Sequence, residues 1–391
     1  RWTNSEIYIL NNYEILERQM TRLFKNLSTL AAAGAGVCLI IWAGNGYAAD
    51  SPSWDAKLAA KYLDDREVEW QEWDRPHTNS ATLCVSCHTQ AAYGLARPIL
   101  HKMTGDETQT PAEKAMLASV IKRVMNWSKM QPVYTDIIFG PGKEIEAYNS
   151  EAVLNAIILT GYDKSAGHMA EATHKAFENA WALQSTSGTD AGSWVPQLFN
   201  LAPFETPESR YYFAALFAVA VGNAPDNYRA DPKISKNLDL LTTYLRSHFE
   251  SQPLLNKIVA LWATHTFPSI LDKSQRATLS QQVDHVQKAD GGWSLTDLGP
   301  WGKRRDGSPF ETRSDGFATG LIALVARESA PELNKKNTSR ALGWLRSNQD
   351  KKTGAWTAWS LNTVRDPASM TGKFMNDTAT AFAVLALSES H

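Results

Sequence analysis

The sequence predicts an all-α fold built from six repeated pairs of helices. Beyond residue 50, apolar residues recur at spacings of three and four, as on one face of a helix, and strand-like alternation is scarce. Helices of two kinds alternate along the chain, and a pattern of Gln, Gly and Trp recurs at the joints between them. These three observations together indicate one structural unit that is used several times.

The first kind of helix is amphipathic and charged, which predicts a position at the outer surface. These outer helices are expected over residues 54–72, 111–130, 165–184, 232–250, 273–288 and 336–348. The second kind is apolar on almost all sides and rich in small residues, which predicts burial. These inner helices are expected over residues 89–103, 151–161, 208–222, 254–266, 315–327 and 377–388. Outer and inner helices therefore alternate along the whole chain.

The joints between helices repeat as well. In residues 184–194, 287–293 and 349–356, a Gln ends an outer helix, a Gly follows in the turn, and a Trp comes next. Gly tolerates the left-handed backbone that commonly ends a helix. We expect the Gln and the Trp to connect successive helix pairs, which accounts for part of the 14 Trp residues of the chain.

These joints resemble the QW motifs of the terpenoid cyclase and protein prenyltransferase superfamily. The resemblance covers residues 54–391 and is strongest in 280–391, where the segments Ser-Asp-Gly-Phe-Ala-Thr-Gly at 314–320 and Asn-Asp-Thr-Ala-Thr-Ala at 376–381 open two inner helices. It implies a toroid of two concentric helix rings, and the six helix pairs match an (α/α)6 closure. We therefore expect residues 50–391 to form one (α/α)6 toroid.

The composition argues against three broad classes of protein. The 39 basic and 41 acidic side chains nearly balance, so the charge offers no overall electrostatic case for a nucleic-acid partner. Hydrophobic residues make up 43% of the chain and charged residues 20%, which allows a sizeable core and excludes global disorder. The 3 Cys residues are too few for a disulfide scaffold.

The amino-terminal segment is expected to direct export. Met20 is followed by a short basic stretch, an apolar run over 27–42, and small residues at 46–48 that suit a cleavage site. We interpret residues 1–19 as translation upstream of the true start and residues 20–48 as a signal peptide that is removed, which predicts a periplasmic or otherwise exported bacterial protein. The alternative is an uncleaved anchor, although the apolar run is short for a membrane span. Membrane association is expected only in that case.

Removal of the signal peptide also removes Cys38 and leaves two Cys in the sequence Cys-Val-Ser-Cys-His at 84–88. In an exported protein, a C-x-x-C-H motif predicts covalent attachment of one c-type haem. Cys84 and Cys87 would bind the two vinyl groups of the haem, and His88 would be the proximal ligand of its iron. The stretch also resembles a bacterial group of exported cyclase-like proteins that carry a haem-binding signature.

Three other interpretations of the motif compete with haem. A redox dithiol would normally lie in a βαβ pattern, which we do not find, a structural disulfide would not need the His, and a zinc site would need further Cys or a close His pair. The sixth iron ligand is either absent or one of several Met and His residues: His77, His101, Met103, Met116, Met125, Met130, His168 and Met169. A separate small cytochrome domain over residues 50–131 is the alternative architecture.

The resemblance also implies candidate acids for isoprenoid chemistry. Class II terpenoid cyclases protonate their substrate with the central Asp of a D-x-D-D motif, and the closest match here is residues 374–378. Asn376 stands at the donor position, and an amide cannot deliver that proton. Asp377 and Asp315 therefore remain as the candidate catalytic residues, with helix capping as the alternative role for both.

The order of the helices predicts where a site would form. All inner helices should run in the same direction because each follows an outer helix, so their amino ends, which carry partial positive charge, should meet with the haem loop at one end of the toroid. We expect Arg210, Tyr211, Trp262 and Asn376 to line a central cavity. The alternative is that the aromatic residues fill the core and that Arg210 pairs with a nearby glutamate.

Three functions are consistent with these patterns. The first is a redox role of an exported c-type haem protein, which would either exchange electrons with a partner protein or oxidise an apolar, isoprenoid-like ligand in the central cavity. The second is an isoprenoid-modifying enzyme, similar to squalene cyclases, that uses Asp315 or Asp377. The third is a non-catalytic protein that binds a lipid-like ligand.

Overall fold

The computed structural model describes residues 54–77, 82–134, 141–331 and 333–388. These residues belong to one compact unit that spans residues 50–391. The predicted upstream segment, residues 1–19, and the predicted signal peptide, residues 20–48, lie outside the described residues. None of the described helices is long and apolar enough to cross a membrane.

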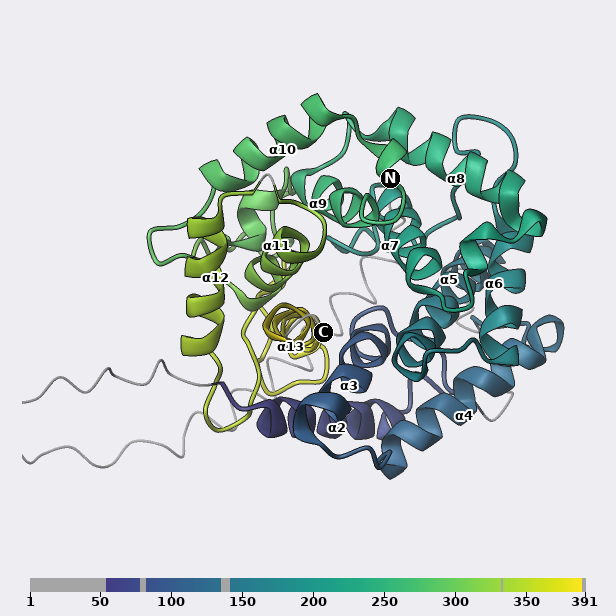
Figure 1. The fold of residues 1–391 in the computed structure, drawn as a ribbon. Helices are drawn as coiled ribbons and strands as arrows, with labels where there is room; N and C mark the ends of the chain where they lie inside the picture. Colours follow the sequence, from purple (N-terminus) through teal and green to yellow (C-terminus); the bar gives the residue numbers. More distant parts are fainter. Residues whose placement is uncertain (1–53, 78–81, 135–140, 332, 389–391) are drawn as a thin grey trace, which may run out of the picture. The chain divides into compact units, whose positions relative to one another are not determined.

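The all-α prediction is confirmed, because the described residues form twelve α-helices and no β-strand. The helices at the periphery of the unit are α2 (Ala56–Glu72), α4 (Pro111–Met125), α6 (Glu171–Leu183), α8 (Ser235–His248), α10 (Lys273–His285) and α12 (Lys335–Ser347). The helices inside them are α3 (Gln90–Thr104), α5 (Pro141–Ala166), α7 (Ser209–Asn223), α9 (Leu254–Ala263), α11 (Gly316–Glu328) and α13 (Phe374–Leu387) (Figure 1). Outer and inner helices alternate along the chain, as the sequence predicts.

The predicted helix bounds agree with the observed ones to within a few residues, except around α5. The sequence predicts an inner helix over 151–161, whereas α5 runs over Pro141–Ala166 and moves the start of α6 to Glu171. The prediction was wrong here because charged residues near both ends of α5, among them Lys143 and Glu144 at the start and Asp163 and Lys164 at the end, interrupt the apolar pattern of its middle part.

The inner helices pack against one another in a closed cycle. α3 packs on α5, α5 on α7, α7 on α9, α9 on α11 and α11 on α13, and α13 packs back on α3. Glycines permit two of these approaches. A Cβ on Gly161 of α5 would lie 2.4 Å from the carbonyl oxygen of Gly94 on α3, and a Cβ on Gly320 of α11 would lie 2.7 Å from the backbone nitrogen of Ala383 on α13. Small residues therefore set how closely the inner helices pack.

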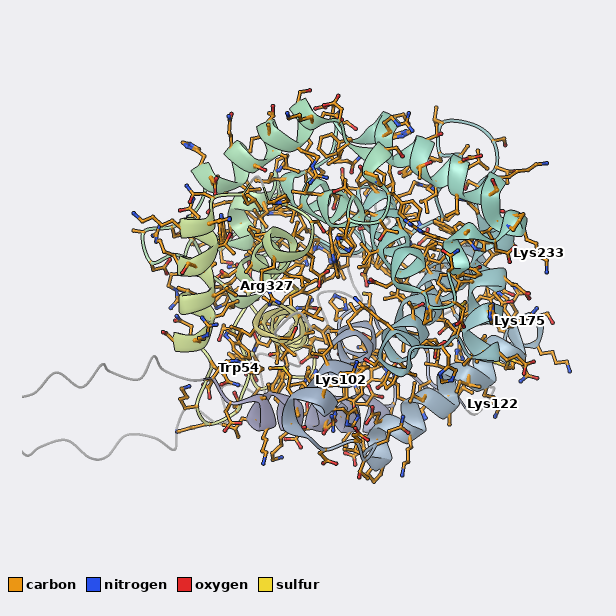
Figure 2. All side chains as sticks on the ribbon, in the orientation of Figure 1. Trp54, Lys102, Lys122, Lys175, Lys233 and Arg327 are labelled. Atoms are coloured by element: carbon orange, nitrogen blue, oxygen red, sulfur yellow. The ribbon has the colours of Figure 1, made fainter. Side chains whose placement is uncertain are left out.

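The outer helices cover this cycle and carry the charged side chains. Figure 2 shows Lys122 of α4, Lys175 of α6 and Lys233, just before α8, directed away from the core. In contrast, α7 and α13 bury almost all of their residues. The amphipathic and the apolar helices of the sequence thus form two layers of the same unit.

The Gln–Gly–Trp joints make the same contacts three times. Their glycines all have positive φ, the left-handed region that favours glycine: +102° at Gly192, +98° at Gly291 and +82° at Gly354. Each indole N–H donates to a carbonyl of the preceding outer helix: Trp194 to Ala180, Trp293 to Val283 and Trp356 to Leu345. Each Gln side-chain amide donates to two backbone carbonyl oxygens. One belongs to the glycine of the same joint and the other to a residue at the start of the next outer helix. The acceptors are Gly192 and Asn237 for Gln184, Gly291 and Asn337 for Gln287, and Gly354 and Asp55 for Gln349. The predicted connection through Gln is confirmed.

The joint at Gln349 connects the end of the helical unit to its beginning. The Nε2 of Gln349 donates to the carbonyl oxygen of Asp55 at 2.9 Å, and its Oε1 accepts from the backbone N–H of Asp55 at 2.6 Å. Asp55 is the N-cap of α2, the first outer helix of the unit. The chemistry that joins neighbouring helix pairs therefore also joins the last pair to the first.

The variant Gln349→Ala should lower the free energy of unfolding by about 1–3 kcal/mol, because it leaves backbone groups of Asp55 and Gly354 without their partners. Urea unfolding followed by circular dichroism measures this change. Gln281→Ala is a matched control, since Gln281 is exposed on α10. Equal unfolding midpoints for the two variants would contradict the role of the joint.

Candidate functional site

The C-x-x-C-H motif lies in the loop that connects α2 to α3 and ends directly before α3. The backbone N–H of Cys84 donates to the carbonyl oxygen of Pro76 at 2.8 Å. The hydroxyl of Ser86 accepts from the backbone N–H groups of His88 and Thr89 at 3.2 and 3.0 Å. These bonds give the motif a defined turn in which the imidazole is half-buried.

A buried ion pair anchors the start of this loop. Arg123 of α4 donates from Nε and Nη2 to the two carboxylate oxygens of Glu151 in α5, each at 2.6 Å. The Nη1 of Arg123 donates to the hydroxyl of Thr82 at 2.7 Å. Next to it, the backbone N–H of Leu83 donates to the hydroxyl of Ser119 at 3.0 Å. The residues before Cys84 are therefore held against α4 and α5.

A second buried ion pair anchors the end of the loop. Arg66 of α2 donates from Nε and Nη2 to the two carboxylate oxygens of Asp377 in α13, at 2.8 and 3.0 Å. Asp377 also accepts from the hydroxyls of Tyr62 and Thr89, each at 2.8 Å. Arg66 and Asp377 are 1% and 0% exposed. The pair ties α2 and α13 to Thr89, the residue that follows His88.

The surroundings of Asp377 bear on its predicted role as an acid. A carboxylate offers about four lone-pair positions, and Arg66, Tyr62 and Thr89 supply four donors to them. Burial raises the pKa of the Asp377 carboxyl, while the Arg66 guanidinium and the two hydroxyls lower it. An acid catalyst must present a proton to a substrate, whereas this side chain faces four protein donors. Its contacts are those of a group that holds three elements together.

A third buried carboxylate supports the middle of the loop. Oε1 of Glu67 accepts from the side-chain amide of Gln90 at 3.0 Å, and Oε1 of Gln90 accepts from the backbone N–H of Ser86 at 3.4 Å. The second carboxylate oxygen of Glu67, Oε2, is buried and has no hydrogen-bond partner. Burial raises the pKa of Glu67 to about 7.

The imidazole of His88 packs between two phenylalanines. The ring of Phe374 stacks on it with a centroid distance of 4.9 Å and an interplanar angle of 16°. The ring of Phe204 meets it edge-on at 5.2 Å and 76°. Burial and the nearby Arg365 lower the pKa of His88 to about 4. The imidazole is therefore neutral at physiological pH, which is the form that binds a metal.

Cys84 and Cys87 are free cysteines. Burial raises the pKa of Cys84 to about 12 and that of Cys87 well above its ordinary value, so both remain thiols at neutral pH. A redox dithiol needs a thiolate, which this environment disfavours. Within the described part of the chain, no three His, Cys, Asp or Glu side chains are grouped so that they could hold a metal ion.

Phe204 lies at the centre of the cycle of inner helices. Its ring contacts His88 before α3, Tyr212 of α7 at 5.2 Å and Phe317 of α11 at 5.8 Å. α3, α7 and α11 are alternate members of the cycle, so a side chain that contacts all three positions lies between them. The loop before α7 thus places an aromatic ring, 2% exposed, next to the motif. Sequence reasoning missed Phe204 because it lies outside any periodic segment.

Asp315 and Asn376 lie at the starts of inner helices, as predicted, and both accept backbone hydrogen bonds. Asp315 is the N-cap of α11 and accepts from the backbone N–H groups of Ala318 and Leu295. Burial raises its pKa to about 7. Asn376 accepts from the backbone N–H of Ala358 at 2.9 Å. The contact of Asp315 with Ala318 is that of the capping alternative, whereas Asn376 holds the loop that precedes α13.

Arg210 contacts the loop between α6 and α7, and Tyr211 contacts the outer helix α8. Arg210 donates to the carbonyl oxygen of Trp194 at 3.2 Å and lies 3.5 Å from Asp190, so its acidic partner is not one of the glutamates considered from the sequence. The hydroxyl of Tyr211 donates to the carbonyl oxygen of Leu245 in α8 at 2.8 Å.

Trp262 contacts an inner helix instead. Its indole N–H donates to Glu328 at the end of α11 at 2.7 Å, and its ring lies 6.2 Å from that of Phe382 in α13. Of the four residues predicted to line a cavity, Trp262 is the one whose ring belongs to the aromatic contacts between inner helices.

Glu205 is a further acid, half-buried, that sequence reasoning did not assign to the site. It follows Phe204, and its Oε2 is buried without a hydrogen-bond partner. Burial raises its pKa to about 7, and the cations Lys143 and Arg365 oppose that rise. The sequence feature that could have pointed to Glu205 is its position next to Phe204 in the loop before an inner helix.

Comparison with models of protein families and with curated proteins found no match to this chain.

The variant Asp377→Asn should lower the free energy of unfolding by about 3–5 kcal/mol, because it removes the buried countercharge of Arg66 and leaves only the partly exposed Glu69 beside the guanidinium. Asp65→Asn is a matched control, since the Lys61–Asp65 pair is exposed, with 68% and 56% of the side chains accessible. That variant should cost less than about 1 kcal/mol. Urea unfolding distinguishes the two, and similar losses in both variants would contradict the anchoring role of Asp377.

The raised pKa of Glu67 predicts a pH dependence of stability. The folded state retains the Glu67 proton to about pH 7, whereas the unfolded chain loses it near pH 4.5, so the free energy of unfolding should fall as the pH rises between these values. In the variant Glu67→Gln this group no longer titrates. Between pH 4.5 and 7, its free energy of unfolding should therefore fall by about 1–3 kcal/mol less than that of the wild type. Urea unfolding at pH 4.5, 6 and 7.5 tests this, and parallel curves for the two proteins would contradict it.

Proposed function

We propose that this chain is an exported c-type haem protein with a redox role, carried on an (α/α)6 toroid similar to that of terpenoid cyclases. The observation that carries the proposal is the C-x-x-C-H loop itself. Its cysteines are free, its imidazole is neutral, and two buried ion pairs hold the loop on both sides. A solvent-exposed chance match to the motif would not require this support.

The helix contacts favour the toroid. The inner helices α3 to α13 follow one another in a closed cycle of contacts, and an outer helix precedes each of them. The joint at Gln349 reaches Asp55 at the start of the first outer helix. The motif precedes α3 in the same way that other loops precede the remaining inner helices, which argues against a separate cytochrome domain over residues 50–131.

The donor set of the loop fits a c-type haem. Two free thiols at C-x-x-C spacing and an adjacent neutral imidazole are the groups that covalent attachment and iron ligation require. Cys84 and Cys87 would hold the porphyrin, and His88 would hold its iron. When bound, the group would supply one-electron redox chemistry.

The residues around the motif would orient the imidazole and exclude water. Phe374 stacks on His88 and restricts rotation of its ring, while Phe204 covers its edge. The hydroxyl of Thr378 donates to the carbonyl oxygen of His88 at 3.4 Å, which adds a contact from α13. A fixed, partly dry imidazole is the arrangement in which protein surroundings tune a bound iron.

Export is part of the proposal and rests on the predicted signal peptide over residues 20–48. An exported haem protein would exchange electrons with a redox partner protein in the same compartment. The near-neutral charge of the chain, 39 basic and 41 acidic residues, does not favour nucleic acid as a partner.

A second candidate function is binding of an apolar, isoprenoid-like ligand between the inner helices. It is favoured by the aromatic contacts that run from Phe204 through Phe317 and Phe382 to Trp262. Isoprenoid cyclisation is less favoured than binding, because both candidate acids, Asp377 and Asp315, face protein donors.

Haem attachment is tested by producing the whole chain in a bacterial host that has cytochrome c maturation machinery. The purified protein should be red, and its colour should stay with the polypeptide through denaturing electrophoresis. The double variant Cys84→Ser/Cys87→Ser should lose all covalent haem.

Cys38→Ser is the matched control, because it replaces the cysteine outside the motif and should leave attachment unchanged. A colourless wild-type protein, or equal haem content in the wild type and the double variant, would overturn the proposal.

A further inference from the structure

A pocket of about 510 Å³ lies between α12 and the loops that precede α11 and α13. Its lining includes two indoles, two cations, a carboxylate and an amide: Trp344, Trp359, Lys288, Arg313, Asp290 and Asn348. Sites for small molecules in proteins have volumes of about 300–1,000 Å³ and combine aromatic walls with a few polar groups. The pocket has both properties, and no residue of the C-x-x-C-H motif contributes to it.

Arg313 is the cation of this pocket that lacks an acidic partner among the described residues. Lys288 forms an ion pair with Asp297, whereas the guanidinium of Arg313 lies over the ring of Trp359, with Cζ 4.6 Å from the ring centroid. This cation–π contact engages the face of the indole and uses no hydrogen bond of the guanidinium. A planar guanidinium presents its N–H groups in the geometry that matches a carboxylate.

Asp290 holds Trp344, another lining residue of the pocket, in place. One of its carboxylate oxygens accepts from the indole N–H of Trp344 at 3.1 Å. The other accepts from the hydroxyl of Ser314 at 2.7 Å and from the backbone N–H of Gly292 at 3.1 Å. Three neutral donors therefore bind Asp290, whose carboxylate keeps its charge. Its effect is to orient the Trp344 ring, while Arg313 is the cation of the pocket without an ion pair among the described residues.

We propose that this pocket binds a small carboxylate that also carries a ring with an apolar face. The carboxylate pairs with Arg313, and the ring lies against the indole of Trp344. Two kinds of molecule share this chemistry: a hexuronic acid, whose pyranose ring has a face of C–H groups, and an aromatic acid. The proposal is independent of haem, since the pocket uses other residues.

Sodium glucuronate, sodium benzoate and glucose are the three probes of the test, added to the purified whole protein. Isothermal calorimetry and saturation-transfer NMR should show saturable binding of glucuronate, benzoate or both, and no binding of glucose. Preference for glucuronate identifies the pocket as a uronic-acid site, and preference for benzoate identifies it as an aromatic-acid site. Absence of binding by both carboxylates, or equal binding of glucose, overturns the proposal.

Two variants and a control locate the binding. Arg313→Gln and Trp359→Leu should each raise the dissociation constant about tenfold or more, because they remove the charge and the surface that supports it. Arg346→Gln on the same helix as Trp344 does not touch the pocket and should change the constant less than about twofold. Unchanged unfolding midpoints show that the variants are folded. A normal dissociation constant for Arg313→Gln contradicts the assigned site.

Discussion

The hydrogen bonds from a joint glutamine to the start of the next outer helix are the contacts on which the rest of the structure depends. They occur three times with the same donor and the same class of acceptor. At Gln349 the acceptor is Asp55, the N-cap of α2, so the last joint holds the start of the first outer helix beside the end of α12. Each bond is modest on its own, at about 0.5–1.5 kcal/mol. Together they fix three of the connections between successive outer helices: α6 to α8, α10 to α12 and α12 to α2.

That closure creates the anchor of the C-x-x-C-H loop. Arg66 belongs to α2 and Asp377 to α13, and the two are 311 residues apart in sequence. A buried ion pair gains little net stability over apolar residues, because removing two charges from water costs several kcal/mol per ion. The role of the buried ion pairs here is to fix the positions of the segments that they join. The Arg66–Asp377 and Arg123–Glu151 pairs fix the end and the start of the loop, so the imidazole of His88 has a defined position.

Much of the fold could be predicted from the sequence because its signals are local. Helix periodicity and the Gln–Gly–Trp joints are read within a few residues, and both predictions agree with the structure. The start of α5 was missed because charged residues near its amino end resemble a loop more than a buried helix. The motif at 84–88 is also a local signal, although haem binding itself stays a prediction.

The partners of the site residues could not be predicted, because they come from distant parts of the chain. Asp377 was recognised as an inner-helix acid, but its four donors come from α2 and from the motif loop. Phe204 lies in an irregular loop, and its central position follows from contacts with three separate inner-helix regions. The hydrophobic periodicity of a sequence gives no information about contacts between distant parts of the chain.

The most direct test of the account is the absorption spectrum of the purified protein, reduced in alkaline pyridine. This solvent replaces the protein ligands of the iron, so the band position reports how the porphyrin is attached. The account predicts one haem per chain with the band of a porphyrin bound through two thioether links. A chain without haem, or one with the band of an unattached porphyrin, would contradict it.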